Sequence, residues 1–197
     1  MITTDRLRKA LAATPAWPWL EEALAAAADR PDSAVRSFAA AGRRAGRAEL
    51  ADAPGWTADE AARALLLAAL PPGQVSAYYE HGDADEKRAV LKALPLLNAG
   101  TDAIPLLQDA IRTNDARLLA AALGPYARHL DQPSWRQAVL KCVFMGVPLD
   151  AVHDLDRRAD AELAAMLAAF AEERAAAGRP MPADAAALLH RLTSEET

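Results

Sequence analysis

The sequence predicts an all-α protein made of stacked antiparallel helix pairs, an irregular HEAT-like α-solenoid of about eleven helices. Leucines and other apolar residues recur at helical spacing along the 197 residues, with proline, glycine or capping residues between the segments. No run of β-branched and aromatic residues alternates with the period of two that a strand requires. Many short helices fit stacked pairs better than a four-helix bundle. A compact globular α-fold is the alternative.

Proline and capping residues mark the helix starts of the N-terminal part. Proline in the first helical turn loses no hydrogen bond, so Pro15 and Pro18 open the second helix after residues 4–13, and Pro31 opens the third. Thr57 and Glu60 form a capping box that starts the fourth helix. The inward-facing residues expected here are Leu7, Leu11, Trp17, Leu20, Leu24, Val35, Phe38, Ala39, Leu65, Leu66, Leu67 and Leu70.

Shorter helices are expected between Pro71 and Leu130. Their first residues or caps are Val75, Asp83, Thr101, Asp115 and Tyr126. Pro95 must kink or end the helix that Asp83 starts, because its ring clashes with the carbonyl four residues earlier. The segment 89–92, Ala-Val-Leu-Lys, recurs at 138–141, which favours a repeat.

The C-terminal part predicts three longer helices. Pro133 opens a nearly apolar helix that Gly146 ends, and residues 159–177 and 182–192 follow. Cys142 has apolar neighbours and no adjacent base, so we expect it to be a buried core residue.

Composition predicts a single helical domain over residues 1–197. Residues 1–56 are a candidate N-terminal helical cap, and residues 57–192 are the expected helical-repeat core. The chain has 51 alanines, which favour helix but bury little apolar area, so the helices are expected to pack closely.

Charge and motifs exclude several classes of function. A net charge of −5 argues against nucleic-acid binding, and no apolar run is long enough to cross a membrane. A single cysteine permits no internal disulfide, and no nucleotide, metalloprotease or hydrolase signature occurs. We therefore expect a cytoplasmic protein with no cofactor and no metal ion.

Candidate site residues concentrate between residues 135 and 160. Lys141 lies among apolar neighbours: it is solvated or salt-bridged, or it anchors a ligand or partner, or, if desolvated, it acts as a base or nucleophile. His153 lies three residues after Asp150 and directly before Asp154, so one short helix would present all three side chains.

Two adjacent arginines follow this acidic turn. Arg157 and Arg158 oppose the helix dipole at the start of a long helix, where negative charge is preferred. Such a departure favours a functional role, such as clamping a carboxylate or phosphate, and pairing with nearby aspartates is the alternative. Asp156 is a candidate N-cap for the same helix.

A group of aromatic and titratable residues lies at Tyr78-Tyr79-Glu80-His81, before Gly82. Because the chain has only ten aromatic residues, this group is a candidate pocket wall, with one of the two tyrosines in the core. Tyr79 is included among the candidate binding residues.

Three segments resemble the EboA family: YYEHGDADEKRAVLKALPLL (78–97), WRQAVLKCVFMGVPL (135–149) and LDRRADAELAAMLAAFAEERAAAGRP (155–180). The first 55 residues contribute little to the likeness. The resemblance implies an all-helical accessory protein encoded with the enzymes of a small-metabolite pathway. The family motif positions that it carries over are Lys141, Gly146, Pro148, Asp156, Arg157, Arg158, Glu173 and Arg174.

The leading hypothesis is a non-catalytic helical scaffold or binding protein for pathway enzymes or an anionic metabolite, with a homodimer as a further expectation. Its candidate binding residues are Lys141, Asp156, Arg157, Arg158, Glu173, Arg174, Tyr79 and His153. The alternative is an acid–base or metal-assisted enzyme that uses His153 with Asp150, Asp154 or Asp156 on a phosphorylated or cyclitol-type intermediate.

Overall fold

The computed structural model describes residues 2–71 and 73–194, and these residues confirm the all-α class. They form twelve α-helices and three short 3₁₀ helices, and the described ranges contain no strand. The chain divides into two compact units, residues 1–106 (unit 1) and 107–197 (unit 2). Each unit is described below by itself. The stacked solenoid and the predicted boundary at residue 56 stay predictions.

The helices have the following bounds. Unit 1 contains α1 (Thr4–Ala12), α2 (Trp17–Asp29), α3 (Ser33–Arg44), α4 (Ala58–Ala68), α5 (Val75–His81), α6 (Ala84–Ala93) and η1 (Leu94–Leu96). Helix α7 (Ile104–Arg112) spans the division between the units. Unit 2 contains α8 (Ala116–Ala122), η2 (Pro125–His129), α9 (Gln132–Met145), η3 (Leu149–Ala151), α10 (Leu155–Arg158), α11 (Ala161–Ala176) and α12 (Ala183–Ser194).

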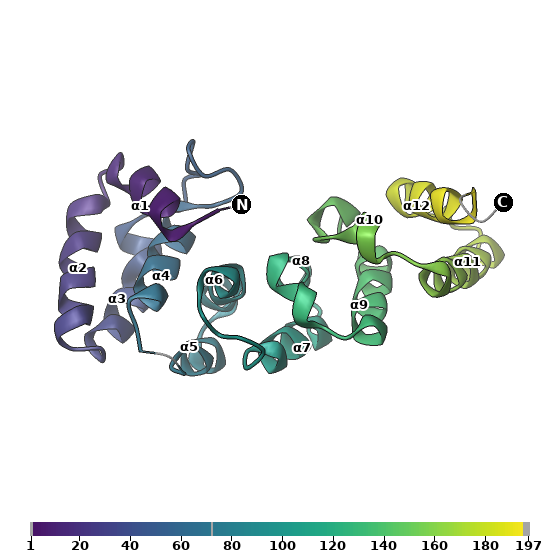
Figure 1. Ribbon diagram of the computed structural model, residues 1–197. Helices are drawn as coiled ribbons and strands as arrows, with labels where there is room; N and C mark the ends of the chain where they lie inside the picture. The colour runs from purple at the N-terminus through teal and green to yellow at the C-terminus, as the bar shows by residue number, and fades with distance from the viewer. Residues whose placement is uncertain (1, 72, 195–197) are drawn as a thin grey trace. The chain divides into compact units, whose positions relative to one another are not determined.

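Helix α4 is the centre of unit 1. It packs against α1, α2, α3 and α6, which lie around it in Figure 1. Every residue from Ala58 to Leu67 is buried, including the charged residues Asp59, Glu60 and Arg63. Alanine at Ala61, Ala62 and Ala64 permits this close approach on several faces, since its side chain occupies little space.

Helix α9 is the corresponding element of unit 2. It packs against α8, α11 and η3, and its buried residues include Trp135 and Cys142. Burial raises the pKa of the Cys142 thiol to about 12, so this cysteine is a core residue with no thiolate at neutral pH. Gly146 ends the helix with a φ of 70°, a conformation that glycine adopts without strain.

Several predicted caps are present. Glu60 Oε2 accepts the backbone N–H of Thr57 at 3.1 Å. Asp83 and Glu86 form a complete capping box, in which each carboxylate accepts the other residue's backbone N–H. No described helix is both long and apolar enough to cross a membrane.

The structure corrects two details of the sequence interpretation. The helix predicted over residues 159–177 begins two residues later, as α11 from Ala161: Asp160, whose side chain accepts from Leu163 N, is its N-cap in place of Asp156, and Leu155–Arg158 form the separate short helix α10. Val35 and Ala39 were expected to face inward, but both are exposed, Val35 to 56%. The buried face of α3 consists of Ala34, Phe38 and Ala41, and Val35 lies beside that face.

Candidate functional site

A broad, solvent-open cavity of about 630 Å³ lies in unit 2, between η3, α10 and α12. We call it the Asp–Arg cavity, after the charged side chains of its wall. It is lined by Leu149, Asp150, Val152, Asp154, Leu155, Asp156, Arg157, Asp184, Ala187, Leu188 and Arg191.

The chain around Gly146 forms one side of the cavity. After the left-handed turn at Gly146, the backbone N–H of Val147 returns to Cys142 O, and Pro148 leads into η3. A second left-handed residue, Asp154 with a φ of 58°, then starts the four-residue helix α10. Aspartate tolerates this conformation better than most residues, so the turn can present the α10 side chains to the cavity.

Helix α12 forms the other side of the Asp–Arg cavity. Asp184 Oδ2 accepts the backbone N–H of Leu149 at 2.9 Å, which fixes the start of α12 against η3. At the other end, Arg191 donates to Asp156 Oδ1 at 2.5 Å. These two contacts hold α12 against η3 and α10 with the cavity between them.

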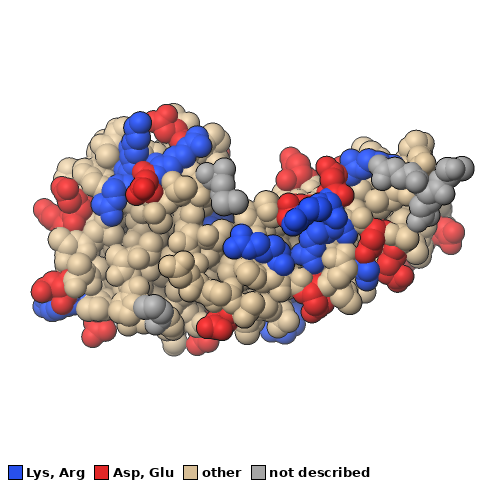
Figure 2. Space-filling model, in the orientation of Figure 1, with Lys and Arg blue, Asp and Glu red and all other residues tan. Residues whose placement is uncertain are grey.

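The electrostatics of the cavity are dominated by aspartate. Arg157 forms an ion pair with Asp154, and Arg191 pairs with Asp156. The four aspartates and two arginines of the wall leave a formal charge of −2. On the face of unit 2 visible in Figure 2, acidic side chains likewise border basic ones. The wall therefore offers both hydrogen-bond donors and acceptors, with a net negative charge.

Arg158 is directed away from the cavity into unit 2. Its guanidinium donates to Ala127 O at 2.8 Å, to Leu130 O at 2.9 Å and to Gln132 Oε1 at 3.1 Å. It also lies over the ring of buried Trp135, at 4.7 Å from the ring centroid. Burial lowers the pKa of Arg158, although this group stays protonated at neutral pH. These contacts satisfy the carbonyls at the end of η2.

Lys141 has a comparable structural position. Its Nζ donates to Ile111 O at 2.5 Å and to Thr113 O at 2.7 Å. These are carbonyls of the last turn of α7 and of the residue after it, where a cation is favoured by the helix dipole. The ammonium group of Lys141 thus caps the C-terminal end of α7, while its apolar stem lies in unit 2.

The other candidate residues lie apart from the cavity wall. Arg174 donates to Pro180 O at 2.7 Å and covers the ring of Phe170, and Glu173 precedes it on the exposed side of α11. His153 contacts Asp154 at 3.5 Å without lining the cavity. Tyr79 is in unit 1, where it is 2% exposed beneath Lys87 Nζ.

Among the sequence-predicted binding residues, the Asp–Arg cavity brings together Asp156 and Arg157. The sequence interpretation missed Asp184 and Arg191, which complete the wall. Their signal was present, because Asp184, Leu188 and Arg191 follow helical spacing and therefore share one face of α12. Within the described ranges, no group of three or more His, Cys, Asp or Glu side chains has the arrangement of a metal site.

Asp160 provides a pH-dependent contribution to the stability of unit 2. The Arg136 guanidinium, with help from Gln132 and the Leu163 N–H, lowers the pKa of Asp160 to about 2. An unfolded aspartate titrates near 3.9, so this contribution is complete above that pH and is lost as the pH falls through about 2. The difference in free energy of unfolding between wild type and Asp160→Asn is therefore expected to shrink as the pH falls from about 5 to about 2. Urea titrations at several pH values measure it, and a constant difference would contradict this assignment.

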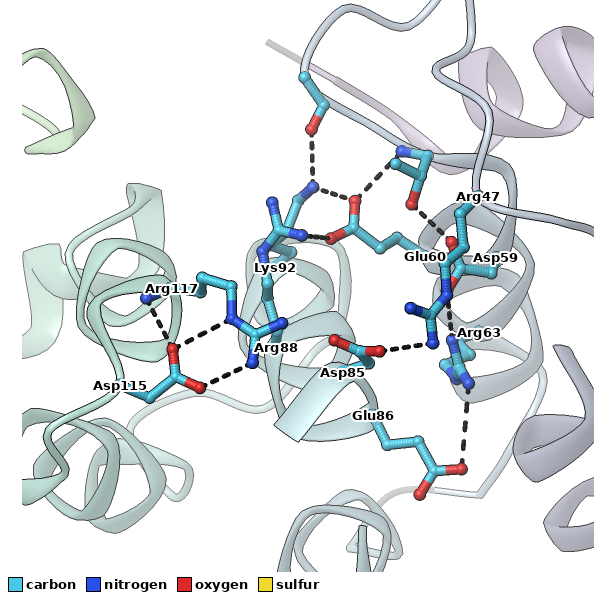
Figure 3. A network of polar contacts seen from close by, with 12 residues as sticks. Arg47, Asp59, Glu60, Arg63, Asp85, Glu86, Arg88, Lys92, Asp115 and Arg117 are labelled. Atoms are coloured by element: carbon cyan, nitrogen blue, oxygen red, sulfur yellow. Dashed lines mark hydrogen bonds and ion pairs between the residues drawn. The ribbon is translucent and has the colours of Figure 1, made fainter. Parts of the chain in front are cut away.

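Unit 1 holds a second charged cluster, which the sequence interpretation did not identify (Figure 3). Arg63 pairs with Asp59 at 2.7 Å, donates to Phe38 O at 3.2 Å and lies over the Phe38 ring. The Asp59 carboxylate also accepts from the Thr57 hydroxyl at 2.6 Å. Phe38, Asp59 and Arg63 are buried and Thr57 is partly buried, so the contacts replace the water that the charges lose on folding.

Glu60 and Lys92 form the second half of this cluster. Glu60 pairs with Lys92 and with Arg88, the latter at 2.8 Å, and Lys92 also donates to Gly55 O. Burial lowers the pKa of Lys92, and the Glu60 carboxylate opposes that effect. Because these charges are engaged with one another, we interpret the cluster as structural rather than as a ligand site.

The chain matches a protein-family model. A model described as "Metabolite traffic protein EboA" matches residues 48–190, which include the charged cluster of unit 1 and nearly all of the Asp–Arg cavity. Helices α1, α2 and α3 lie before the match. No curated protein and no solved structure matches the chain.

Proposed function

The chain belongs to the EboA family, and from that premise we propose that it is a non-catalytic accessory protein that binds a small polar metabolite. The Asp–Arg cavity is the site that we assign to this metabolite. The observation that carries the assignment is the combination of a cavity of about 630 Å³ with a wall of paired carboxylates and guanidinium groups. Small-molecule sites typically enclose about 300–1,000 Å³.

The charges of the wall favour a particular kind of ligand. Each arginine already faces a carboxylate, and the wall keeps a formal charge of −2. A phosphate or carboxylate would have to displace an aspartate and meet further negative charge. A polyhydroxylated ligand would instead donate to the aspartates and accept from Arg157 and Arg191 without such repulsion. A polyol therefore fits this wall better than the anion that the sequence suggests.

The composition of the wall also favours binding over catalysis. The described residues that line the cavity include no Ser, Thr, Cys, Tyr or His that would serve as a nucleophile or imidazole base. The enzyme alternative needs His153 to reach a substrate beside the aspartates, and His153 is not part of the lining. A ligand-transfer role, which the family description suggests, requires only reversible binding.

Ligand capture by the double variant Arg157→Ala/Arg191→Ala tests this proposal. Wild type isolated from its own cells is expected to carry a small molecule detectable by native mass spectrometry, and the double variant is expected to lose it. Both arginines are substantially exposed, so the free energy of unfolding is expected to change by less than about 1 kcal/mol.

Arg112→Ala is the matched control for this experiment. Arg112 is 73% exposed and pairs with Asp109 three residues earlier, as Arg157, 74% exposed, pairs with Asp154. Titration with myo-inositol and myo-inositol 1-phosphate then separates a polyol from an anion. The proposal is contradicted if wild type carries no bound molecule. It is also contradicted if the double variant retains the bound molecule as Arg112→Ala does.

An exposed aromatic pair favours partner binding as a second candidate function. Phe144 on α9 is 72% exposed, and its ring meets the Phe170 ring of α11 edge to face at 6.5 Å. Large exposed aromatic side chains are enriched at protein interfaces. In the same isolation experiment, a pathway enzyme retained by wild type and lost from Phe144→Ser would support this function, and equal retention by both would exclude it.

A further inference from the structure

A second cavity lies in unit 1, between α3, α5 and the start of α6. Its volume is about 240 Å³, and most of its wall is apolar. The residues that define its chemistry are Val35, Phe38, Tyr78, His81, Gly82 and Glu86. We call it the Tyr78 groove. All of its residues belong to unit 1, so it is independent of the Asp–Arg cavity.

The apolar part of the Tyr78 groove is built from two aromatic rings and an exposed valine. The Phe38 and Tyr78 rings meet edge to face, with their centroids 4.9 Å apart. Val35, which the sequence placed in the core, is 56% exposed at the same groove. An aliphatic side chain left this exposed beside two rings provides apolar surface that a ligand would remove from water.

The polar end of the groove is supplied by Glu86 and His81. Glu86 Oε2 accepts the Asp83 backbone N–H, while Oε1 lies 3.9 Å from Nη2 of Arg63, longer than a hydrogen bond. Oε1 therefore retains the capacity to accept a hydrogen bond from a ligand. The His81 Nδ1 contacts Ala77 O at 2.9 Å and must donate there, because a carbonyl oxygen only accepts.

Gly82 brings these two polar residues together. A Cβ atom on Gly82 would lie 2.7 Å from Tyr78 O, closer than real contacts allow, and 3.0 Å from Glu86 Cβ, a tight contact. The absence of a side chain at residue 82 therefore helps the end of α5 to lie close to the start of α6. This approach places His81 and Glu86 on the wall of one groove.

The local charge favours a cationic ligand. Burial is the main cause of the raised pKa of Tyr78, and the Asp32 carboxylate, which adds to it, places a second negative charge near the groove besides Glu86. Arg63, the cation behind Phe38, is buried and already paired with Asp59 at 2.7 Å. An ammonium group in the groove would therefore meet Glu86 without an unpaired cation beside it, and two aromatic rings would flank it.

We propose that the Tyr78 groove binds a small primary amine with an aromatic or aliphatic body. The ammonium group donates to Glu86 Oε1, and the body lies against Val35, Phe38 and Tyr78. The groove is slightly smaller than a typical drug-sized site, which suits a ligand of fragment size. This proposal does not depend on the function proposed for unit 2.

Titration with 2-phenylethylamine, followed by NMR chemical-shift changes, tests the groove. The amine is expected to bind saturably. The neutral 2-phenylethanol is expected to bind with lower affinity, and the anionic 3-phenylpropionate with the lowest affinity of the three. Glu86→Gln is expected to lower the affinity for the amine about tenfold and to leave the affinity for the alcohol unchanged, since the substitution removes only the charge of the acceptor. Glutamine also serves in a capping box, so α6 keeps its N-terminal contacts.

Two further variants separate the outcomes. Val35→Trp is expected to fill the groove and abolish binding of the amine and the alcohol alike, whereas Arg157→Ala/Arg191→Ala in unit 2 is expected to bind both as wild type does. The proposal is overturned if the amine fails to saturate, if amine and propionate bind equally, or if folded Glu86→Gln and Val35→Trp both keep wild-type affinity. A lysine-containing peptide is titrated in the same way. If it binds more tightly than the free amine, the ligand of the groove is a protein partner and the small-molecule proposal is wrong.

Discussion

Replacing Arg63 by methionine is expected to lower the free energy of unfolding of unit 1 by about 3–5 kcal/mol. The Arg63 side chain is 4% exposed, and it provides the paired charge for Asp59 and the donor for Phe38 O. Methionine fills a similar volume but leaves the Asp59 carboxylate buried with the Thr57 hydroxyl as its remaining neutral donor. Chemical denaturation followed by circular dichroism measures the loss.

A double variant controls for the desolvated carboxylate. Asp59→Ala with Arg63→Met removes both charges, so the double variant is expected to be more stable than the sum of the single losses predicts. Additive losses, or a loss below about 1 kcal/mol for Arg63→Met alone, would show that the ion pair carries little of the stability of α4.

Arg158→Ala is expected to destabilise unit 2 by about 2–4 kcal/mol, because it leaves the carbonyls of Ala127 and Leu130 without their charged donor and uncovers Trp135. The adjacent residue provides the control. Arg157 is 74% exposed and pairs only with Asp154 in the described contacts, so Arg157→Ala is expected to change stability by less than about 1 kcal/mol. Chemical denaturation of Arg157→Ala and Arg158→Ala measures the two losses in free energy of unfolding. Equal losses would contradict the assignment of a structural role to Arg158 alone.

The fold class and most helix ends were predictable because they depend on local chemistry. The Asp83–Glu86 capping box and the left-handed Gly146 act within a few residues of the sequence. The N-cap of α11 was not predicted correctly, because Asp156 and Asp160 are both suitable caps. Pairing of Asp160 with Arg136, on another helix, helps to place the cap, and no local pattern reveals such a contact.

The candidate site was predictable only in part, for the same reason. The sequence located the charged corner at Asp156 and Arg157, but it treated Arg157 and Arg158 alike. Consecutive residues on a helix point about 100° apart, so one arginine reaches the cavity while the other reaches the carbonyls after η2. The burial of Asp59 and Arg63 depends on how α3 and α6 pack against α4, which capping patterns do not describe.

The complete enclosure of α4 has a consequence for how unit 1 opens. Because α1, α2, α3 and α6 all pack on this one helix, none of them can separate without exposing part of its buried surface. Opening any of them therefore costs a large share of the global unfolding free energy, and the α4 amide protons exchange with solvent only through near-complete unfolding. Helix α12 packs mainly on α11 and is joined to η3 and α10 by the Asp184 and Arg191 side chains, so it can detach in a smaller, local fluctuation. We therefore expect unit 1 to unfold as one cooperative unit, and the amide protons of α12 to exchange faster than those of α4.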